Sequence, residues 1–238
     1  MTLMQFTLEK ARSVALRGQR YQCPICEGRF TYFLPFEGIF PSENGICPGC
    51  GSMPRQRALW LLLLDLAKKG EIRLAGRMLH VAPERCLTRR FRKMFDYVSV
   101  DLDGAKAMRA GDITDLREFD NNTFDAIVCN HVLEHVVEDR KAMAELYRVL
   151  RPDGWASLQV PWRHDAPTDE DSNVTDPSER ERRWQQWNHV RLYGYDYSER
   201  LEAAGFRVKM SRWEEFVALE KARFHVANSL DMMIMAWK

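Results

Sequence analysis

Four cysteines carry the clearest chemical pattern in this chain of 238 residues. They form two C-x-x-C pairs, Cys23-Pro-Ile-Cys26 and Cys47-Pro-Gly-Cys50, with 20 residues between them. Thiolates at this spacing can surround one tetrahedral ion, and zinc is the expected metal because it accepts four sulfur ligands. All four coordination positions are then filled by protein, so we expect a structural ion. A rubredoxin-like iron site and disulfides are the alternatives.

A second pattern, His131-x-x-Glu134-His135, could also hold a metal. It matches the inverted zinc-protease motif H-x-x-E-H, in which two imidazoles on one helix face a single ion. No third ligand is apparent from the sequence, and the motif directly follows an apolar strand-like segment. We therefore favour proton transfer as the role of the histidines, because imidazole suits general-base chemistry near neutral pH.

Acidic residues follow two of the short apolar segments. Asp101 ends Y-V-S-V (97–100), and Asp112 follows a short segment at 108–110. An acid at the end of the second strand of an open α/β sheet is placed to accept both hydroxyls of a nucleoside ribose. A carboxylate after the third strand could accept a hydrogen bond from an adenine amino group.

Alternating apolar and helical-length segments between Arg77 and Val160 must position these side chains. The alternation predicts βαβ units that form a parallel sheet. We expect the helix capped by Asn130 to run through His131 and His135, and a second helix over 138–150. The expected strands are 78–81, 97–100, 108–110, 124–129 and 155–160, followed by an antiparallel pair at 207–216 and 229–237.

The N-terminal part is expected to be a smaller element. Residues 5–18 predict an amphipathic helix, and residues 53–69 predict a helix with Ser52 as its N-cap. Arg55 and Arg57 fall in the first turn of that second helix, where the helix dipole disfavours cations. Their position indicates an anionic ligand or a carboxylate partner.

The stretch F-D-A-I-V-C-N-H-V-L-E-H-V-V-E-D-R-K-A-M-A-E-L-Y-R-V-L-R-P-D-G-W (124–155) resembles the motif IV to motif V block of class I S-adenosylmethionine-dependent methyltransferases. With the acid-ended second strand and Gly111-Asp112-Ile113-Thr114, the resemblance covers roughly residues 77–162. Residues 188–206 are similar to bacterial members, some of which also carry cysteine knuckles. The resemblance implies a Rossmann-like α/β fold: a mostly parallel seven-stranded sheet with an antiparallel C-terminal strand, beside a zinc-ribbon-like element.

The resemblance also implies S-adenosylmethionine (SAM) as cofactor, with one departure. Members usually have an acid and G-x-G-x-G after the first strand, whereas this chain has His80-Val81-Ala82-Pro83-Glu84. Pro83 has no backbone N–H, so we expect His80 or Glu84 to hold the methionine end of SAM. The implied cofactor-binding residues are His80, Ala82, Glu84, Asp101, Leu102, Asp112, Ile113 and Asn130.

Methyl transfer to a hydroxyl or amine benefits from a base, and we expect His131, His135 or His189 to supply it. Arg191 and Tyr193 are the expected substrate contacts. The segments resemble small-molecule and glycan methyltransferases, so we expect a small metabolite or sugar acceptor, methylated at oxygen. The alternative is an RNA methyltransferase that binds RNA through the zinc element and the basic N-terminal half.

Composition and charge set broad limits. The net charge is +1, but residues 1–100 hold 16 Lys and Arg against 8 Asp and Glu, a net charge of +8. No signal peptide or bilayer-length apolar segment is evident, so we expect a cytoplasmic protein without a membrane partner. The expected domains are 1–52 (N-terminal helix and zinc-binding element), 53–76 (linking helix) and 77–238 (methyltransferase domain). Residues 163–187 could form a lid, and the oligomeric state stays open.

Overall fold

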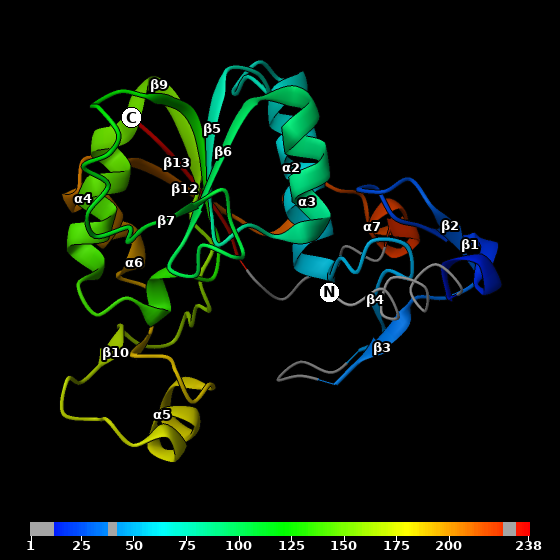
Figure 1. The fold of residues 1–238 in the computed structure, drawn as a ribbon. Helices are drawn as coiled ribbons and strands as arrows, with labels where there is room; N and C mark the ends of the chain where they lie inside the picture. Colours follow the sequence, from blue (N-terminus) through cyan, green and yellow to red (C-terminus); the bar gives the residue numbers. More distant parts are fainter. Residues whose placement is uncertain (1–11, 38–41, 226–231) are drawn as a thin grey trace. The chain divides into compact units, whose positions relative to one another are not determined.

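The computed structural model describes residues 12–37, 42–225 and 232–238 (Figure 1). The chain divides into two compact units. Unit 1 consists of Met1–Glu71, Glu84–Arg90 and Arg212–Leu230, and unit 2 of Ile72–Pro83, Phe91–Ser211 and Asp231–Lys238. Most of the predicted N-terminal helix, and the first residues of the predicted last strand, lie outside the described residues. The predicted domain boundaries stay predictions.

Unit 2 is built on a seven-stranded sheet with the strand order β12-β13-β9-β8-β5-β6-β7 (Figure 1). The strands from β9 to β7 are parallel, and β13 is antiparallel to both of its neighbours. The predicted mostly parallel sheet with an antiparallel C-terminal strand is therefore confirmed. The strands are β5 (Arg77–Val81), β6 (Asp96–Asp101), β7 (Arg109–Ala110), β8 (Phe124–Cys129), β9 (Leu150–Ser157), β12 (Arg207–Ser211) and β13 (Met233–Trp237).

Both faces of the central strands are buried, which explains their nearly continuous apolar sequences. On β5, Leu79 and Val81 face the core shared with α4 (Asp139–Val149) and α6 (Tyr197–Ala203). These two helices lie on the same side of the sheet (Figure 1). His80 points to the other face, where its ring meets Phe91 of α3 (Arg85–Met94) with centroids 5.4 Å apart.

The register of the central strands aligns their carboxyl ends. Val81 at the end of β5 lies opposite Val100 on one side and Cys129 on the other. Residues that follow these three positions therefore meet at one edge of the sheet. This is the edge where open α/β sheets bind their ligands.

Two predicted elements of unit 2 are wrong in detail. The chain after β8 does not form a regular helix through His131, because His131 has a φ of 54°, outside the right-handed helical region. A single 3-10 turn, η1 (Leu133–His135), follows instead. At the other end, β12 stops at Ser211 and the turn η2 (Trp213–Glu215) replaces the predicted end of that strand.

The polar segment 163–187 contains regular structure. Its strand β10 (Asp169–Glu170) pairs with β11 (Arg191–Leu192), and its helix α5 (Pro177–Trp184) is capped by the Asp176 carboxylate, which accepts the Glu179 N–H at 2.9 Å. Trp184, the last residue of α5, is fully buried. A lid function for this segment stays a prediction.

Unit 1 contains two β-hairpins and the helices α2 (Pro54–Lys68) and α7 (Leu219–His225). The hairpins pair β1 (Arg17–Gln22) with β2 (Arg29–Phe30), and β3 (Leu34–Phe36) with β4 (Ser42–Ile46). The predicted cap of α2 is wrong, because Met53 is the N-cap and the Gln56 side chain accepts its N–H at 2.9 Å. In the parts of the chain that the structure describes, no helix has the length and apolar character needed to span a bilayer.

We predict that Gly76→Ala destabilises the protein more than Gly70→Ala. Both glycines have positive φ angles, 96° and 76°, so each replacement should cost about 1–2 kcal/mol. Only at Gly76 would the new Cβ also collide, 2.4 Å from Asp125 Oδ2, an atom that accepts the Arg77 N–H at 2.7 Å. Urea unfolding measures both variants, and equal losses of stability would contradict the predicted clash.

Candidate functional site

The turn after β5 holds the first residues of the candidate site. Ala82 has a φ of 44°, a left-handed conformation that costs a non-glycine residue roughly 1–2 kcal/mol. Its N–H donates to the Val100 carbonyl at 2.8 Å, so the strained turn is tied to β6. The chain thus keeps a glycine-like backbone at this position although the glycine is absent, and such strain concentrates at functional sites.

The ends of β6 and β7 present carboxylates. Asp101 accepts the Asp103 N–H at 2.8 Å through Oδ1, which leaves Oδ2 for another donor. Leu102 beside it is 80% exposed, an unusual position for leucine. Asp112 is exposed and accepts the Thr114 N–H at 2.8 Å through Oδ1. One acid, one apolar side chain and a second acid therefore follow neighbouring strands, and contacts of these residues with ribose and adenine stay a prediction.

Asn130, after β8, is buried and held by β9. Its Oδ1 accepts from Ser157 Oγ at 2.8 Å and from the Gln159 N–H at 3.3 Å. The His131 N–H donates to the Gln159 carbonyl at 2.7 Å. These bonds hold the backbone where His131 leaves the strand, so the direction of the following residues is well defined.

Two other predicted cofactor residues have partners within the protein. His80 is fully buried, its Nδ1 is 3.0 Å from the Tyr97 hydroxyl, and its ring packs between Phe91 and Tyr97. Glu84 belongs to unit 1, where its carboxylate accepts from Gln56 Nε2 at 2.8 Å. Cofactor binding by His80 and Glu84 stays a prediction. Ile113 is buried in the core of unit 2.

The three predicted histidines gather around one carboxylate. His131 Nδ1 is 3.5 Å from Glu134 Oε1, and the rings of His135 and His189 meet with centroids 4.7 Å apart. Glu134 is only 1% exposed. Burial lowers the pKa of the His189 imidazole, which favours the neutral ring. Sequence reasoning noted Glu134 in H-x-x-E-H but did not connect it to His189.

Arg191 and Tyr193 fix this arrangement from inside the protein. Arg191 is 4% exposed and donates through its Nη atoms to the carbonyls of Leu133 and Val137, at 3.1 and 2.9 Å. The Tyr193 hydroxyl donates to Asp139 Oδ2 at 2.8 Å, and burial raises the pKa of Tyr193 well above its ordinary value. Both side chains hold the 189–193 segment against η1; substrate contact for them stays a prediction.

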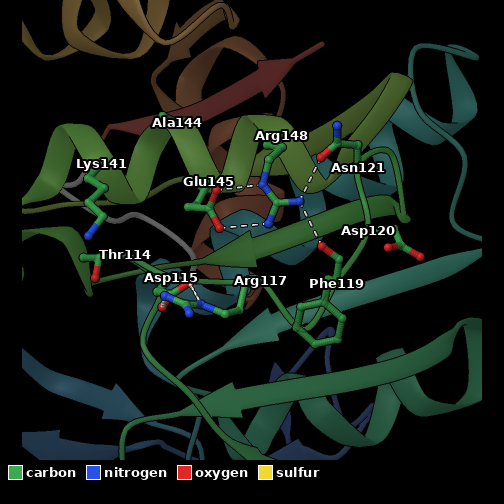
Figure 2. Close-up of a pocket in the computed structure, with 10 residues that line it drawn as sticks. All are labelled: Thr114, Asp115, Arg117, Phe119, Asp120, Asn121, Lys141, Ala144, Glu145 and Arg148. Carbon is green, nitrogen blue, oxygen red and sulfur yellow. Dashed lines mark hydrogen bonds and ion pairs between the residues drawn. The ribbon is translucent and has the colours of Figure 1, made fainter.

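A pocket of about 700 Å³ lies between α4 and the loop 114–121, and none of the predicted site residues lines it (Figure 2). Arg148 crosses it and donates to both carboxylate oxygens of Glu145, at 2.7 and 2.8 Å. The same guanidinium donates to the Phe119 carbonyl and to Asn121 Oδ1, both at 2.9 Å. These contacts attach the loop to α4, so we interpret the pocket as structural.

The four cysteines of unit 1 come together as one cluster of free thiols. Cys23 Sγ lies 3.6 Å from Cys50 Sγ, and Cys26 Sγ lies 3.7 Å from Cys47 Sγ. Tetrahedral coordination with metal–sulfur bonds of about 2.3 Å requires sulfurs roughly 3.8 Å apart. The spacing therefore fits a tetrahedral ion and is far too long for disulfides.

The two knuckles repeat one backbone pattern. Cys23 N–H donates to the Gly28 carbonyl at 3.0 Å and its carbonyl accepts the Glu27 N–H at 2.8 Å. Cys47 makes the equivalent pair with Ser52 and Gly51, both at 2.9 Å. Each knuckle starts where a strand ends, so the two hairpins aim their thiols at a common point.

Arg57 and Ser52 surround this cluster. Ser52 Oγ is 3.4 Å from Cys23 Sγ and 3.3 Å from Cys50 Sγ. Arg57 is fully buried and donates to the carbonyls of Ser52 and Gly45. Burial lowers the pKa of Arg57 to about 10, and the neighbouring thiols oppose that shift, so the side chain stays cationic at neutral pH. The cation in the first turn of α2 thus lies beside the cysteine cluster.

Comparison with known proteins agrees with this geometry. Residues 71–158 match the family model described as "Methyltransferase domain". The YcgJ protein of Bacillus subtilis has a similar fold, with a TM-score of 0.53 at 15% identity over 77% of this chain and 98% of that one. The 1,6-didemethyltoxoflavin-N1-methyltransferase of Burkholderia thailandensis has a TM-score of 0.50 at 18% identity, over 76% of this chain and 78% of that one.

No curated protein matches the chain significantly. The family match covers the strands and turns that carry Ala82, Asp101, Asp112 and Asn130. The mostly parallel seven-stranded sheet with an antiparallel C-terminal strand is the sheet that the sequence resemblance implied. Residues 71–158 therefore form a methyltransferase domain, and the sheet around them has the fold of class I S-adenosylmethionine-dependent methyltransferases.

Proposed function

We propose that the protein transfers a methyl group from SAM to a hydroxyl oxygen of a small metabolite or sugar. The observation that carries this proposal is the position of His131 and its partner Glu134. They follow β8 directly, at the same edge of the sheet as the carboxylate of Asp101. A base and a nucleoside-binding acid at one strand edge are what a methyltransferase acting on a hydroxyl requires.

Asp101 is the residue that we expect to hold the ribose of SAM. Its free Oδ2 would accept from the ribose hydroxyls, while exposed Leu102 would pack on the adenine and Asp112 would accept from the adenine amino group. When bound, SAM would supply a methyl group on a sulfonium; as the acceptor oxygen bonds to that carbon, the electron pair of the broken C–S bond stays on sulfur, which becomes a thioether. The strained turn at Ala82 fits a close approach of the cofactor.

His131 is the histidine best placed to take the hydroxyl proton. Its side chain is 17% exposed, whereas His189 is buried and its Nδ1 is bound to a carbonyl. The Glu134 carboxylate beside His131 would orient the ring and stabilise the imidazolium that forms. A hydroxyl nucleophile needs such a base, whereas a neutral amine already has a free electron pair. This requirement is why we propose oxygen as the methyl acceptor.

The Burkholderia protein supports a small acceptor, because it is an N1-methyltransferase with 1,6-didemethyltoxoflavin bound. Because that protein is only 18% identical, the acceptor atom proposed for this chain rests on the position of His131. The alternative, an RNA methyltransferase, depends on cations in the N-terminal half. Some of these are engaged inside unit 1: Arg57 is buried, and Arg90 pairs with Glu27 at 2.7 Å. RNA affinity that falls steeply with salt would favour the alternative.

We further propose that the Cys23, Cys26, Cys47 and Cys50 cluster binds structural zinc, with Arg57 balancing part of the thiolate charge. The sulfur spacing supports a tetrahedral ion, and zinc is the ordinary occupant of such four-cysteine sites. A small unit made of two short hairpins needs an additional stabilising link, which the ion would supply.

Replacing Asp101 tests the cofactor site. Titration calorimetry with S-adenosylhomocysteine should show that Asp101→Ala weakens binding at least about 30-fold, because charged hydrogen bonds contribute roughly 2 kcal/mol or more. Asp96→Ala is the matched control, since Asp96 begins the same strand at the opposite edge and is exposed. Equal affinities for the two variants would exclude the ribose contact, and absence of binding by the wild type would exclude the cofactor itself.

Replacing one cysteine tests the metal. Cys47→Ala should remove one equivalent of zinc and lower the free energy of unfolding of unit 1 by several kcal/mol, because metal binding and folding are coupled. Cys86→Ala is the control, since Cys86 is a buried cysteine of the same unit outside the cluster. Elemental analysis and thermal unfolding provide the readouts. Iron in place of zinc, or full metal content in Cys47→Ala, would contradict the assignment.

A further inference from the structure

A second set of potential metal ligands lies in unit 2, apart from the cysteines. The ligand atoms of Glu134, His135 and His189 all lie within 4.8 Å of one another. Glu134 and His135 come from η1, and His189 comes from the chain just before β11. The Val190 N–H donates to the Glu134 carbonyl at 2.9 Å, which holds the two segments together.

The two imidazoles are already oriented as ligands. His135 Nδ1 lies 3.3 Å from the Asn188 carbonyl, and His189 Nδ1 lies 2.8 Å from the Trp184 carbonyl. A carbonyl only accepts, so each Nδ1 carries the proton and the Nε2 of each neutral ring keeps its lone pair. Histidines that bind metals are usually held in this way, with the second nitrogen donating to a carbonyl.

One oxygen of the buried Glu134 carboxylate lacks a hydrogen-bond partner among the described residues. The residue is 1% exposed, and this oxygen is Oε2. A buried carboxylate oxygen without a donor is costly, so a cation or a donor is expected beside it. Here the neighbours are two rings whose remaining nitrogens offer lone pairs, and a positive ion would satisfy all three groups at once.

From these contacts we propose that Glu134, His135 and His189 form a binding site for a divalent transition-metal ion such as zinc. Two imidazoles and one carboxylate are typical ligands of such ions and leave coordination positions open. Ligand atoms around zinc are roughly 3.4 Å apart, so binding would draw the three side chains inward by about 1 Å or more. In this interpretation, Glu134 and His135 of the H-x-x-E-H motif bind the ion together with His189, and His131 is not a ligand.

The open coordination positions would allow the ion to take part in the reaction. This role rests on the proposed function. An ion held by Glu134 would lie close to His131, the proposed base, because Glu134 Oε1 is 3.5 Å from His131 Nδ1. A hydroxyl oxygen bound to the ion would be polarised, which makes its proton easier for His131 to remove. The acceptor class becomes narrower as a result: a hydroxyl compound able to bind a metal, such as a vicinal diol of a sugar.

The test is a cobalt(II) titration of the full-length protein, purified with its cysteine-bound metal in place. Calorimetry and optical spectra should show one further equivalent of cobalt, with ligand-field bands but without sulfur-to-metal charge transfer. Glu134→Gln and His189→Asn should each weaken this binding more than about 100-fold, since loss of an outer partner alone costs 10–100-fold. His164→Ala, an exposed histidine outside the cluster, should bind cobalt as the wild type does.

The wild-type titration is decisive even if a variant folds poorly. Uptake of no further cobalt, or only sulfur-type spectra, would overturn the site, and so would unchanged affinity in a folded Glu134→Gln. Titration of the same samples with S-adenosylhomocysteine separates the two proposals. Binding of the thioether without cobalt overturns the metal site alone, whereas cobalt binding without the thioether overturns the proposed function alone.

Discussion

The common level at which β5, β6 and β8 end is the constraint on which the rest of unit 2 depends. Parallel pairing places Val81 between Val100 and Cys129, so the residues that follow each strand must share one edge. Apolar burial on both faces holds that register, because a slip by one residue would turn every side chain to the wrong face. Chemistry at this edge is therefore a consequence of how the strands pack.

A buried ionic network connects the start of α4 to the segment that carries His189. Asp139, at the start of α4, lies near Arg191 and Arg200 and accepts from the Tyr193 hydroxyl. Glu170 of β10 pairs with both arginines at 2.9 Å, and their hydrogen bonds, led by that of Arg200, lower the pKa of Glu170. Removal of one partner from such a network leaves a buried charge uncompensated. The polar segment between β9 and β11 thus contributes to the position of His189.

The sheet could be predicted from sequence because local apolar runs determine strands that are buried on both faces. The cysteine cluster could be predicted because each knuckle is local. The approach of His189 to His135 could not, since it spans 54 residues and depends on buried contacts of Arg191 that no spacing reveals. Ser52 was expected to cap a helix, but its side chain contacts thiols and the buried cation of Arg57 instead.

If the cysteines bind the proposed zinc ion, the burial of Arg57 makes the stability of this unit depend on metal supply. With an ion bound, the thiolates would carry negative charge beside the guanidinium; without it, the thiols would take up protons, and the buried cation would keep its carbonyl partners but lose that compensating charge. In a chain synthesised during metal shortage, the cysteine unit would then be exposed to proteases before it could fold. Metal supply would in this way determine how much folded protein accumulates.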